Sequence, residues 1–293
     1  MLLFYNLDNI NELDINYPDI YFTPEYGKAC EYSDNAIWEL CKFKDLIYVY
    51  LKKPIEFENN TYYDLITPYG YSGYYYENKN TYDDFIPLFR QEAKKRNYIT
   101  EVLRQNPYLD IKIENYEVIS SKTLFAANSI TYEDYINSIK KSTRKNINKI
   151  NKSNYNYNFI KLNEGDLKKY NFYELYNLTM ERNNSKPYYY FNQDYFDCLE
   201  KNDNTYLSIL NLNDKIIGLQ LILKYKNFIH VHLSCDDRSS NLIKLALING
   251  LVKHNVNDKI IFIFGCGIKE GDTLAYFKSG YSNKNYKYVI YKK

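Results

Sequence analysis

The chain has 293 residues, 45% of them hydrophobic, and a formal net charge of +2 at pH 7. A chain of this length is near the size at which one hydrophobic core stops growing, so we expect two domains. The nearly balanced charge excludes a general attraction to nucleic acid or membranes, and any such attraction must be local. No apolar run reaches the roughly 20 residues that cross a bilayer, which predicts a cytoplasmic protein without a transmembrane segment.

The first half of the sequence alternates short apolar runs with turn residues. This pattern predicts three strands, then a helix, then two more strands. The expected ranges are 36–41, 46–51, 62–67, 82–96, 98–103 and 116–126.

A basic amphipathic helix is expected where the two halves meet. Thr131 can cap this helix through Asp134. Isoleucines form one stripe of the helix, and basic residues form another. The basic stripe predicts a phosphate-contacting face for RNA, with a solvated helix face as the alternative. Its candidate nucleic-acid-binding residues are Lys141, Arg144, Lys145 and Lys149.

The second half has a clearer pattern, which predicts the order β-α-α-β-β-β-α-β-α-β. Asn192 can cap the second helix. Two-residue polar joints at 213–214 and 226–227 require antiparallel neighbours among the three central strands. The expected ranges are 155–162, 166–183, 192–200, 205–212, 215–225, 228–235, 239–254, 260–264, 273–278 and 286–291.

Six short motifs occur in a fixed order along the chain. They are TPYGYSG (67–73), SIKKSTRKNINK (138–149), LTMERNN (178–184), HVHLSCDD (230–237), IFGCG (263–267) and YFKSGY (276–281). Together they resemble the FemABX-like tandem-GNAT acyl- and aminoacyltransferases, over nearly the whole chain and most firmly over 131–285. The chain departs from that group in lacking the long helical-hairpin arm of some members and in reading Gly265-Cys266-Gly267 at the C-terminal glycine turn.

The resemblance implies an α/β fold with mixed sheets, built as two tandem GNAT-like domains at 1–131 and 132–293. It also implies transfer of an acyl group to an amine. In the best-known members an amino acid passes from aminoacyl-tRNA to the peptide stem of a cell-wall precursor. The alternatives are an acyl-CoA-dependent N-acyltransferase that acts on an amino sugar or similar acceptor, and a non-catalytic RNA- or glycan-binding module.

Five residues of the second half are candidates for catalysis or for binding the acceptor. Lys278 matches a lysine that similar enzymes place near the reacting centre, where an ammonium could stabilise an oxyanion; an exposed surface lysine is the alternative. His232 and Asp236 are candidates for the general base. Arg182, with Asn183 beside it, matches an arginine directed at the phosphates of the acceptor, and a salt bridge at the helix end is the alternative.

Two glycine turns are candidate substrate-binding segments. The resemblance implies that Tyr69, Gly70, Tyr71 and Gly73 line the acceptor groove, with a tyrosine-rich hairpin corner as the alternative. Gly265 and Gly267 follow a buried strand, where a bare backbone permits either a ligand's approach or a turn with positive φ.

We expect no tightly bound cofactor and no metal, with aminoacyl-tRNA or acyl-CoA as co-substrate and tRNA and an envelope precursor as partners. The five cysteines are widely spaced and lack a paired C-x-x-C. The segment 238–242 lacks the glycines with which CoA-dependent enzymes bind pyrophosphate, which disfavours acetyl-CoA.

Overall fold

The computed structural model describes residues 1–293, apart from the side chain of Glu12. The chain divides into two compact units, unit 1 (Met1–Lys122 and Lys287–Lys293) and unit 2 (Thr123–Tyr286). The division runs through the strands β7 (Glu117–Ala127) and β13 (Lys284–Lys292). Each unit is therefore completed by a strand segment from the other half of the sequence. The domain boundary at residue 131 stays a prediction.

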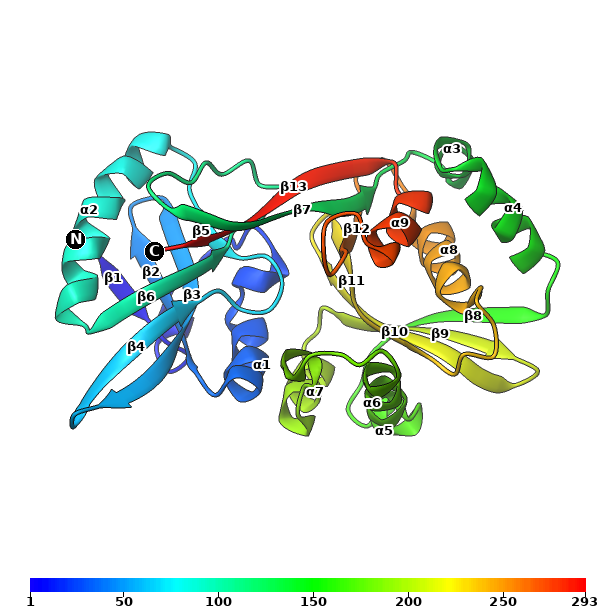
Figure 1. The fold of residues 1–293 in the computed structure, drawn as a ribbon, viewed down its shortest axis with the longest axis horizontal. Coiled ribbons are helices and arrows are strands. Elements are labelled where there is room, and N and C mark those ends of the chain that lie inside the picture. Colours follow the sequence, from blue (N-terminus) through cyan, green and yellow to red (C-terminus); the bar gives the residue numbers. More distant parts are fainter. The chain divides into compact units, whose positions relative to one another are not determined.

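Unit 1 is a mixed sheet with the strand order β1-β2-β3-β4-β6-β13, and β5 pairs with β3 (Figure 1). The pair β4 and β6 is parallel, and the other pairs are antiparallel. Its elements are β1 (Leu3–Tyr5), α1 (Pro24–Asp34), β2 (Ile37–Phe43), β3 (Leu46–Phe57), β4 (Asn60–Ile66), β5 (Gly73–Tyr75), α2 (Lys79–Lys95) and β6 (Tyr98–Arg104), with short 3-10 helices at Ile10–Glu12 and Ile20–Phe22. The predicted strands and α2 are confirmed within a few residues, except that β3 is longer, whereas α1, β1 and β5 were not predicted.

Many of the tyrosines of unit 1 are part of its core. Tyr48 and Tyr74 are buried in one cluster with the phenylalanines of α2. Glu101 on β6 accepts hydrogen bonds from Tyr48 Oη (2.5 Å), Tyr74 Oη (2.9 Å) and Tyr116 Oη (2.7 Å). Burial raises the pKa of all three hydroxyls well above the ordinary value, so they remain donors. The network satisfies polar groups that would otherwise be costly to bury.

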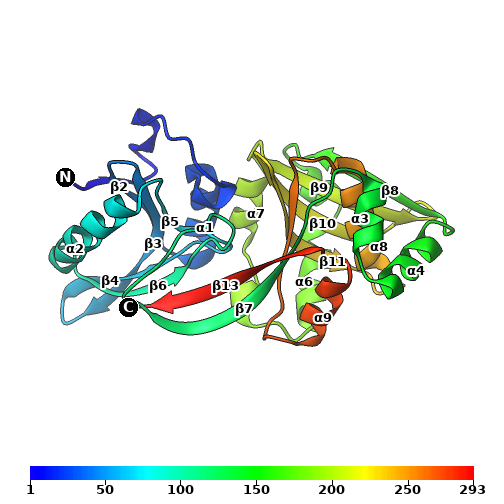
Figure 2. The ribbon, with the colours of Figure 1, turned by 90° about the horizontal axis from the view of Figure 1, so that it is seen from above.

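Unit 2 has a sheet with the order β7-β12-β11-β10-β9-β8. The pair β11 and β12 is parallel, and the other pairs are antiparallel, which confirms the prediction from the short joints. Helix α8 lies on one face of this sheet and α6 on the other (Figures 1 and 2). Its elements are α3 (Tyr132–Ser138), α4 (Lys141–Ile150), β8 (Tyr155–Lys161), α5 (Asp166–Lys169), α6 (Phe172–Arg182), a 3-10 helix (Pro187–Tyr189), α7 (Gln193–Glu200), β9 (Thr205–Leu212), β10 (Lys215–Tyr225), β11 (Phe228–Asp236), α8 (Ile243–Asn255), β12 (Ile261–Cys266) and α9 (Thr273–Gly280).

The parallel strands β11 and β12 pair only over the first three residues of each. Their register runs from Phe228 opposite Ile261 to His230 opposite Ile263. Beyond that point β11 continues to Asp236 and β12 to Cys266 without further register between them. The sheet therefore opens between the carboxyl ends of two neighbouring strands, a position at which α/β proteins commonly bind ligands.

Three predicted helices differ from the structure. The helix expected from Thr131 is two helices, because Ile139 is extended (φ −90°, ψ 167°), although Thr131 caps α3 as predicted. The pattern at 166–183 is also divided, since Asn171 has φ +53° between α5 and α6. Helix α8 begins at Ile243, four residues later than predicted.

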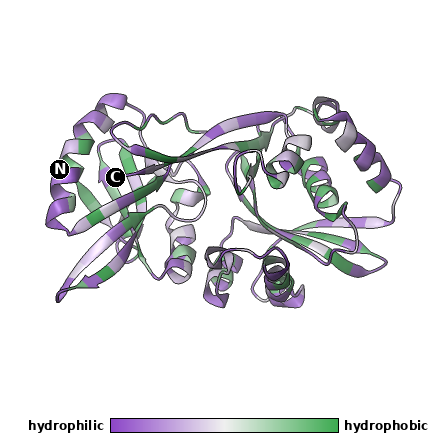
Figure 3. Ribbon diagram, in the orientation of Figure 1, coloured by the Kyte–Doolittle hydropathy of each residue, from purple (hydrophilic) through white to green (hydrophobic). Residues whose placement is uncertain are grey.

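The distribution of apolar residues agrees with a mixed α/β fold. In Figure 3 α8 and much of β9 to β12 are hydrophobic, whereas α4 is mostly hydrophilic. Most of the α8 side chains join a core cluster with Ile217, Ile222 and Phe262 of the sheet. Among the described residues, no helix combines the length and the apolar character that crossing a membrane would require.

Candidate functional site

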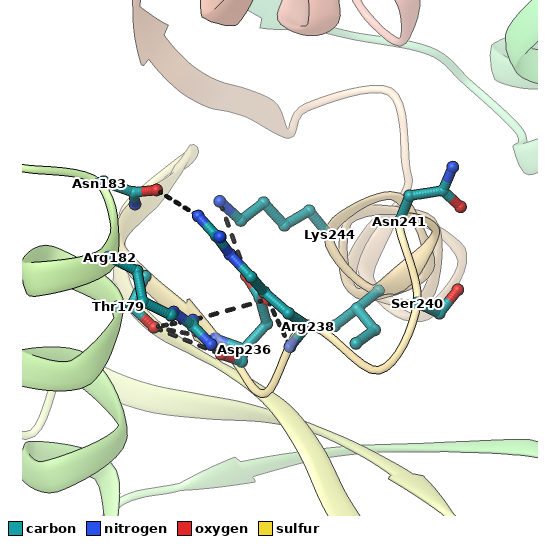
Figure 4. Close-up of a pocket in the computed structure, with 9 residues that line it drawn as sticks. Thr179, Arg182, Asn183, Asp236, Arg238, Ser240, Asn241 and Lys244 are labelled. Carbon is teal, nitrogen blue, oxygen red and sulfur yellow. Dashed lines mark hydrogen bonds and ion pairs between the residues drawn. The ribbon is translucent and has the colours of Figure 1, made fainter.

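A pocket of about 330 Å³ lies where β11 ends and α8 begins (Figure 4). It collects side chains from the end of α6, the end of β11, the loop that follows β11 and the first turn of α8. The lining residues are Thr179, Arg182, Asn183, Asp236, Arg238, Ser240, Asn241, Ile243 and Lys244. Of the predicted site residues, Arg182, Asn183 and Asp236 meet here.

Arg182, the last residue of α6, bonds to the end of β11. Its Nη2 donates to Thr179 Oγ1 (2.8 Å) and to the carbonyl oxygen of Asp236, and lies 3.8 Å from Asp236 Oδ1. Its buried Nε has no hydrogen-bond partner among the described residues. Arg182 ends α6 and forms an ion pair with Asp236, and its guanidinium lines the pocket; its contact with a phosphate stays a prediction.

Two more cations converge on the same pocket. Arg238 has a left-handed backbone (φ +60°), and its Nη2 donates to Asn183 Oδ1 (3.3 Å). Lys244 Nζ lies 3.6 Å from Asp236 Oδ2. The lining thus holds three cations against one carboxylate, and it includes residues of the α8 N-terminus, where unsatisfied N–H groups favour anions. The pocket is therefore suited to an anionic group such as a phosphate.

Lys278 lies on α9, outside the pocket lining but within its electrostatic reach. Its Nζ donates to the carbonyl oxygen of Cys266 at the end of β12 (2.8 Å). Desolvation lowers the pKa of Lys278, Cys266 and Asp272 oppose this shift, and the charge of Lys244 adds to it, so that the pKa is about 8. Both protonation states of Lys278 are therefore accessible near neutral pH.

The conformation and contacts of the turn between β12 and α9 require glycine at positions 265 and 267. Asp272 caps α9, since its Oδ1 accepts from Ala275 N (2.7 Å) and its Oδ2 from Ile268 N (2.7 Å) and Lys269 N (2.8 Å). A Cβ at Gly267 would come within 2.4 Å of Asp272 Oδ1, and Gly265 has φ +81°. Both glycines have a structural reason, and their contact with a ligand stays a prediction.

His232 occupies a β-bulge. Leu221 pairs with Leu233, but Ile222 pairs with Val231, so His232 is the extra residue of β11. Its Nε2 lies 2.6 Å from Tyr195 Oη. Burial, with a smaller effect of His230, lowers the pKa of His232 to about 3. His232 is therefore neutral and only a weak base at physiological pH, and its catalytic role stays a prediction.

The other predicted site residues lie elsewhere. Tyr69, Gly70, Tyr71 and Gly73 belong to unit 1, where the carbonyl oxygen of Tyr69 accepts from Tyr26 Oη (2.6 Å) and the ring of Tyr71 contacts Tyr21 edge-on. On α4 of unit 2, Lys141, Lys145 and Lys149 are exposed. Arg144 instead donates from Nη1 to Asn137 O (2.8 Å) and Ile139 O (3.2 Å), bracing the break between α3 and α4.

Sequence reasoning missed six residues that line the pocket: Thr179, Arg238, Ser240, Asn241, Ile243 and Lys244. Two signals were present. Thr179 stands in the same motif as Arg182, and Arg238 and Lys244 flank the start of a predicted helix directly after a strand. Among the described residues, no group of three or more His, Cys, Asp or Glu side chains is arranged to hold a metal ion.

Solved structures share this fold. A structure of FemX superposes with a TM-score of 0.69 at 11% identity, covering 99% of this chain and 97% of that one. L-PGS from Bacillus licheniformis gives 0.60 at 12% identity, covering 90% and 85%. A tandem GNAT protein from the clavulanic acid biosynthesis pathway, in a form without AcCoA, gives 0.50 at 8% identity, covering 100% and 98%. No protein-family profile and no curated protein sequence matches the chain. The chain therefore has a GNAT-like fold, and the expected fold class is confirmed.

Proposed function

We propose that this protein is an acyltransferase that moves an aminoacyl group from aminoacyl-tRNA to an amine of a cell-envelope precursor. The observation that carries the proposal is the cationic pocket at the carboxyl end of β11, where Lys244 is close enough to Lys278 to lower its pKa. The motif resemblance to FemABX-like transferases and the fold shared with FemX and L-PGS support it. A cytoplasmic location fits a tRNA-linked donor.

The proposed reaction is amide formation from an ester. The acceptor nitrogen attacks the ester carbonyl carbon, the C–N bond forms, and a tetrahedral oxyanion develops on the carbonyl oxygen. The C–O bond to the ribose then breaks, and the ribose oxygen leaves with a proton lost by the amine. In this scheme the ammonium of Lys278 stabilises the oxyanion. Arg182, Arg238 and Lys244 hold a phosphate of the precursor, and Asp236 fixes two of these cations.

One alternative donor, acyl-CoA, has an observation in its favour. The N-terminus of α8 contributes to the cationic pocket, and helix N-termini bind pyrophosphate in many proteins. Against this donor, the loop 238–242 supplies side chains and no glycine. The same loop can hold a nucleotide-linked precursor, which the aminoacyl proposal requires.

The donor is tested by offering each candidate separately. Purified protein is incubated with a nucleotide-linked, amine-bearing cell-wall precursor and either mixed aminoacyl-tRNAs or acetyl-CoA, and products are identified by mass. We expect an aminoacylated precursor with the first donor only. Product from acetyl-CoA alone would establish the acyl-CoA-dependent alternative. No product from either donor would contradict the proposed reaction and favour a non-catalytic binding module.

Pocket variants test the assignment of the phosphate. Arg238→Ala and Lys244→Ala each remove one charged partner, so we expect the KM for the precursor to rise about tenfold. The matched control is Lys259→Ala, at an exposed lysine outside the pocket. An unchanged KM in both pocket variants would exclude this pocket as the precursor site.

A further inference from the structure

Unit 2 has a second cavity, of about 470 Å³, between the end of α4, β8 and the middle of α8. Tyr155 and Tyr157 of β8 line it, together with Asn249 and His254 of α8 and with Asn151, which follows α4. None of these residues belongs to the site described above. The cavity therefore needs its own explanation.

The floor of this cavity is closely packed and offers both rings and hydrogen-bonding groups. The Tyr157 ring packs directly on α8, because a Cβ at Gly250 would come within 2.3 Å of it, and Tyr157 Oη bonds to Ser208 Oγ (2.8 Å). Asn249 is only 5% exposed, and its Oδ1 accepts from Tyr132 Oη (2.6 Å). That bond leaves the amide donors of Asn249 unused. Aromatic faces beside fixed amides are how proteins hold an unstacked base.

Four exposed lysines without ion pairs to described residues lie on α4 and directly after it, next to residues that line the cavity. Lys141, Lys145 and Lys149 of α4 and Lys152 after it are exposed, and in the described chain no ion pair or side-chain hydrogen bond engages them. Lys149 and Lys152 flank Ile150 and Asn151, which line the cavity. The apolar residues of α4, Ile147 and Ile150, are buried in the core. The exposed residues of α4 are therefore polar or basic. Helix α4 is mostly hydrophilic in Figure 3, and its exposed side lacks the apolar residues that enter a bilayer.

We propose that α4 and this cavity form one binding site for single-stranded RNA. The phosphates lie along the lysines, and one base enters the cavity, where Tyr155 and His254 contact its faces and Asn249 its edge. The inference deepens the proposed function and rests on it for the choice of an RNA donor. Its test needs no catalysis.

The test measures binding of a fluorescein-labelled 12-nucleotide single-stranded RNA as a function of salt. In a triple variant, Lys145, Lys149 and Lys152 are each replaced by Ala. The negative slope of log K against log salt should become shallower by about 2, since each phosphate contact to a single strand contributes about −0.7. The matched control replaces Lys168 and Lys169 of α5 and Lys201 after α7, three exposed lysines elsewhere in unit 2, and should leave the slope unchanged.

The cavity is tested separately from the lysines. Tyr155→Ala and His254→Ala should each weaken RNA binding about tenfold at an unchanged salt slope, whereas Tyr155→Phe, which keeps the ring, should bind as the native protein does. Circular dichroism checks that the variants fold. Native affinity in both alanine variants would overturn the base pocket, and stronger binding to phosphatidylglycerol vesicles than to RNA would overturn the choice of RNA. RNA binding without aminoacyl transfer would contradict only the proposed function, and transfer with native affinity in the alanine variants only this inference.

Discussion

Gly70 shows how a single residue can resemble a ligand site and yet serve the core. Its φ is +113°, and a Cβ there would lie 2.3 Å from the ring of Tyr21, which is buried. The backbone must be bare because a tyrosine ring occupies the space. This gives the motif around Gly70 a sufficient structural reason within unit 1, and its place in an acceptor groove stays a prediction.

Replacing Gly70 with alanine should therefore destabilise the protein strongly. We expect the free energy of unfolding to fall by about 2–4 kcal/mol, since the strain of the left-handed region adds to the overlap with Tyr21. Gly165→Ala is the control, because Gly165 has φ +91° and nothing within 4 Å of an added Cβ. It should lose only about 1–2 kcal/mol. Equal losses of unfolding free energy in the two variants, measured by urea denaturation, would show that the Tyr21 ring moves aside at little cost.

The candidate site could be predicted from the sequence only where a motif marks it. The motif around Arg182 pointed to a phosphate ligand, but the contact of Arg182 with the Asp236 carbonyl joins residues 54 positions apart. The signal for Arg238 and Lys244, their place around a predicted helix start, was weak, because a lysine or arginine near a helix start is common. Their significance depends on the fold bringing α6 and the loop after β11 together.

At the scale of elements, local signals located most helices and strands, and tertiary contacts decided where they break. The cap from Thr131 to Asp134 was readable because it lies within three residues. The break at Ile139 was not, because the bond from Lys140 N to Gly280 O and the brace from Arg144 hold it. The bulge at His232 was equally hidden, since it exists only relative to β10. Periodicity therefore predicted the order of the elements but not the bulge at His232.

At the scale of the whole molecule, each unit takes a strand segment from the other half of the sequence. In unit 2, Leu124 to Ala127 of β7 pair with the strand β12. In unit 1, the end of β13 pairs with β6. Cutting the chain at residue 131 would remove the β7 partner of β12 and expose a sheet edge.

This arrangement predicts which fragment of the chain folds. A fragment of residues 123–286 should be soluble and melt cooperatively, whereas one of residues 132–293, which lacks the β7 segment, should melt at a lower temperature and aggregate. Thermal melting by circular dichroism, with light scattering, compares the two. A fragment 132–293 at least as stable as 123–286 would show that the β7 segment adds nothing to unit 2.

The central claim is that the Lys278 ammonium stabilises the oxyanion, and the pH dependence of kcat for aminoacyl transfer tests it most directly. The lowered pKa leaves the ammonium largely present below about pH 8 and lost above it. We therefore expect kcat of the native protein to fall above pH 8, while Lys278→Arg, whose charge persists, lacks this fall. Lys278→Ala should lose about 10²-fold in kcat at pH 7. A native kcat that rises through pH 8 relative to Lys278→Arg, or full activity of Lys278→Ala, would contradict the account.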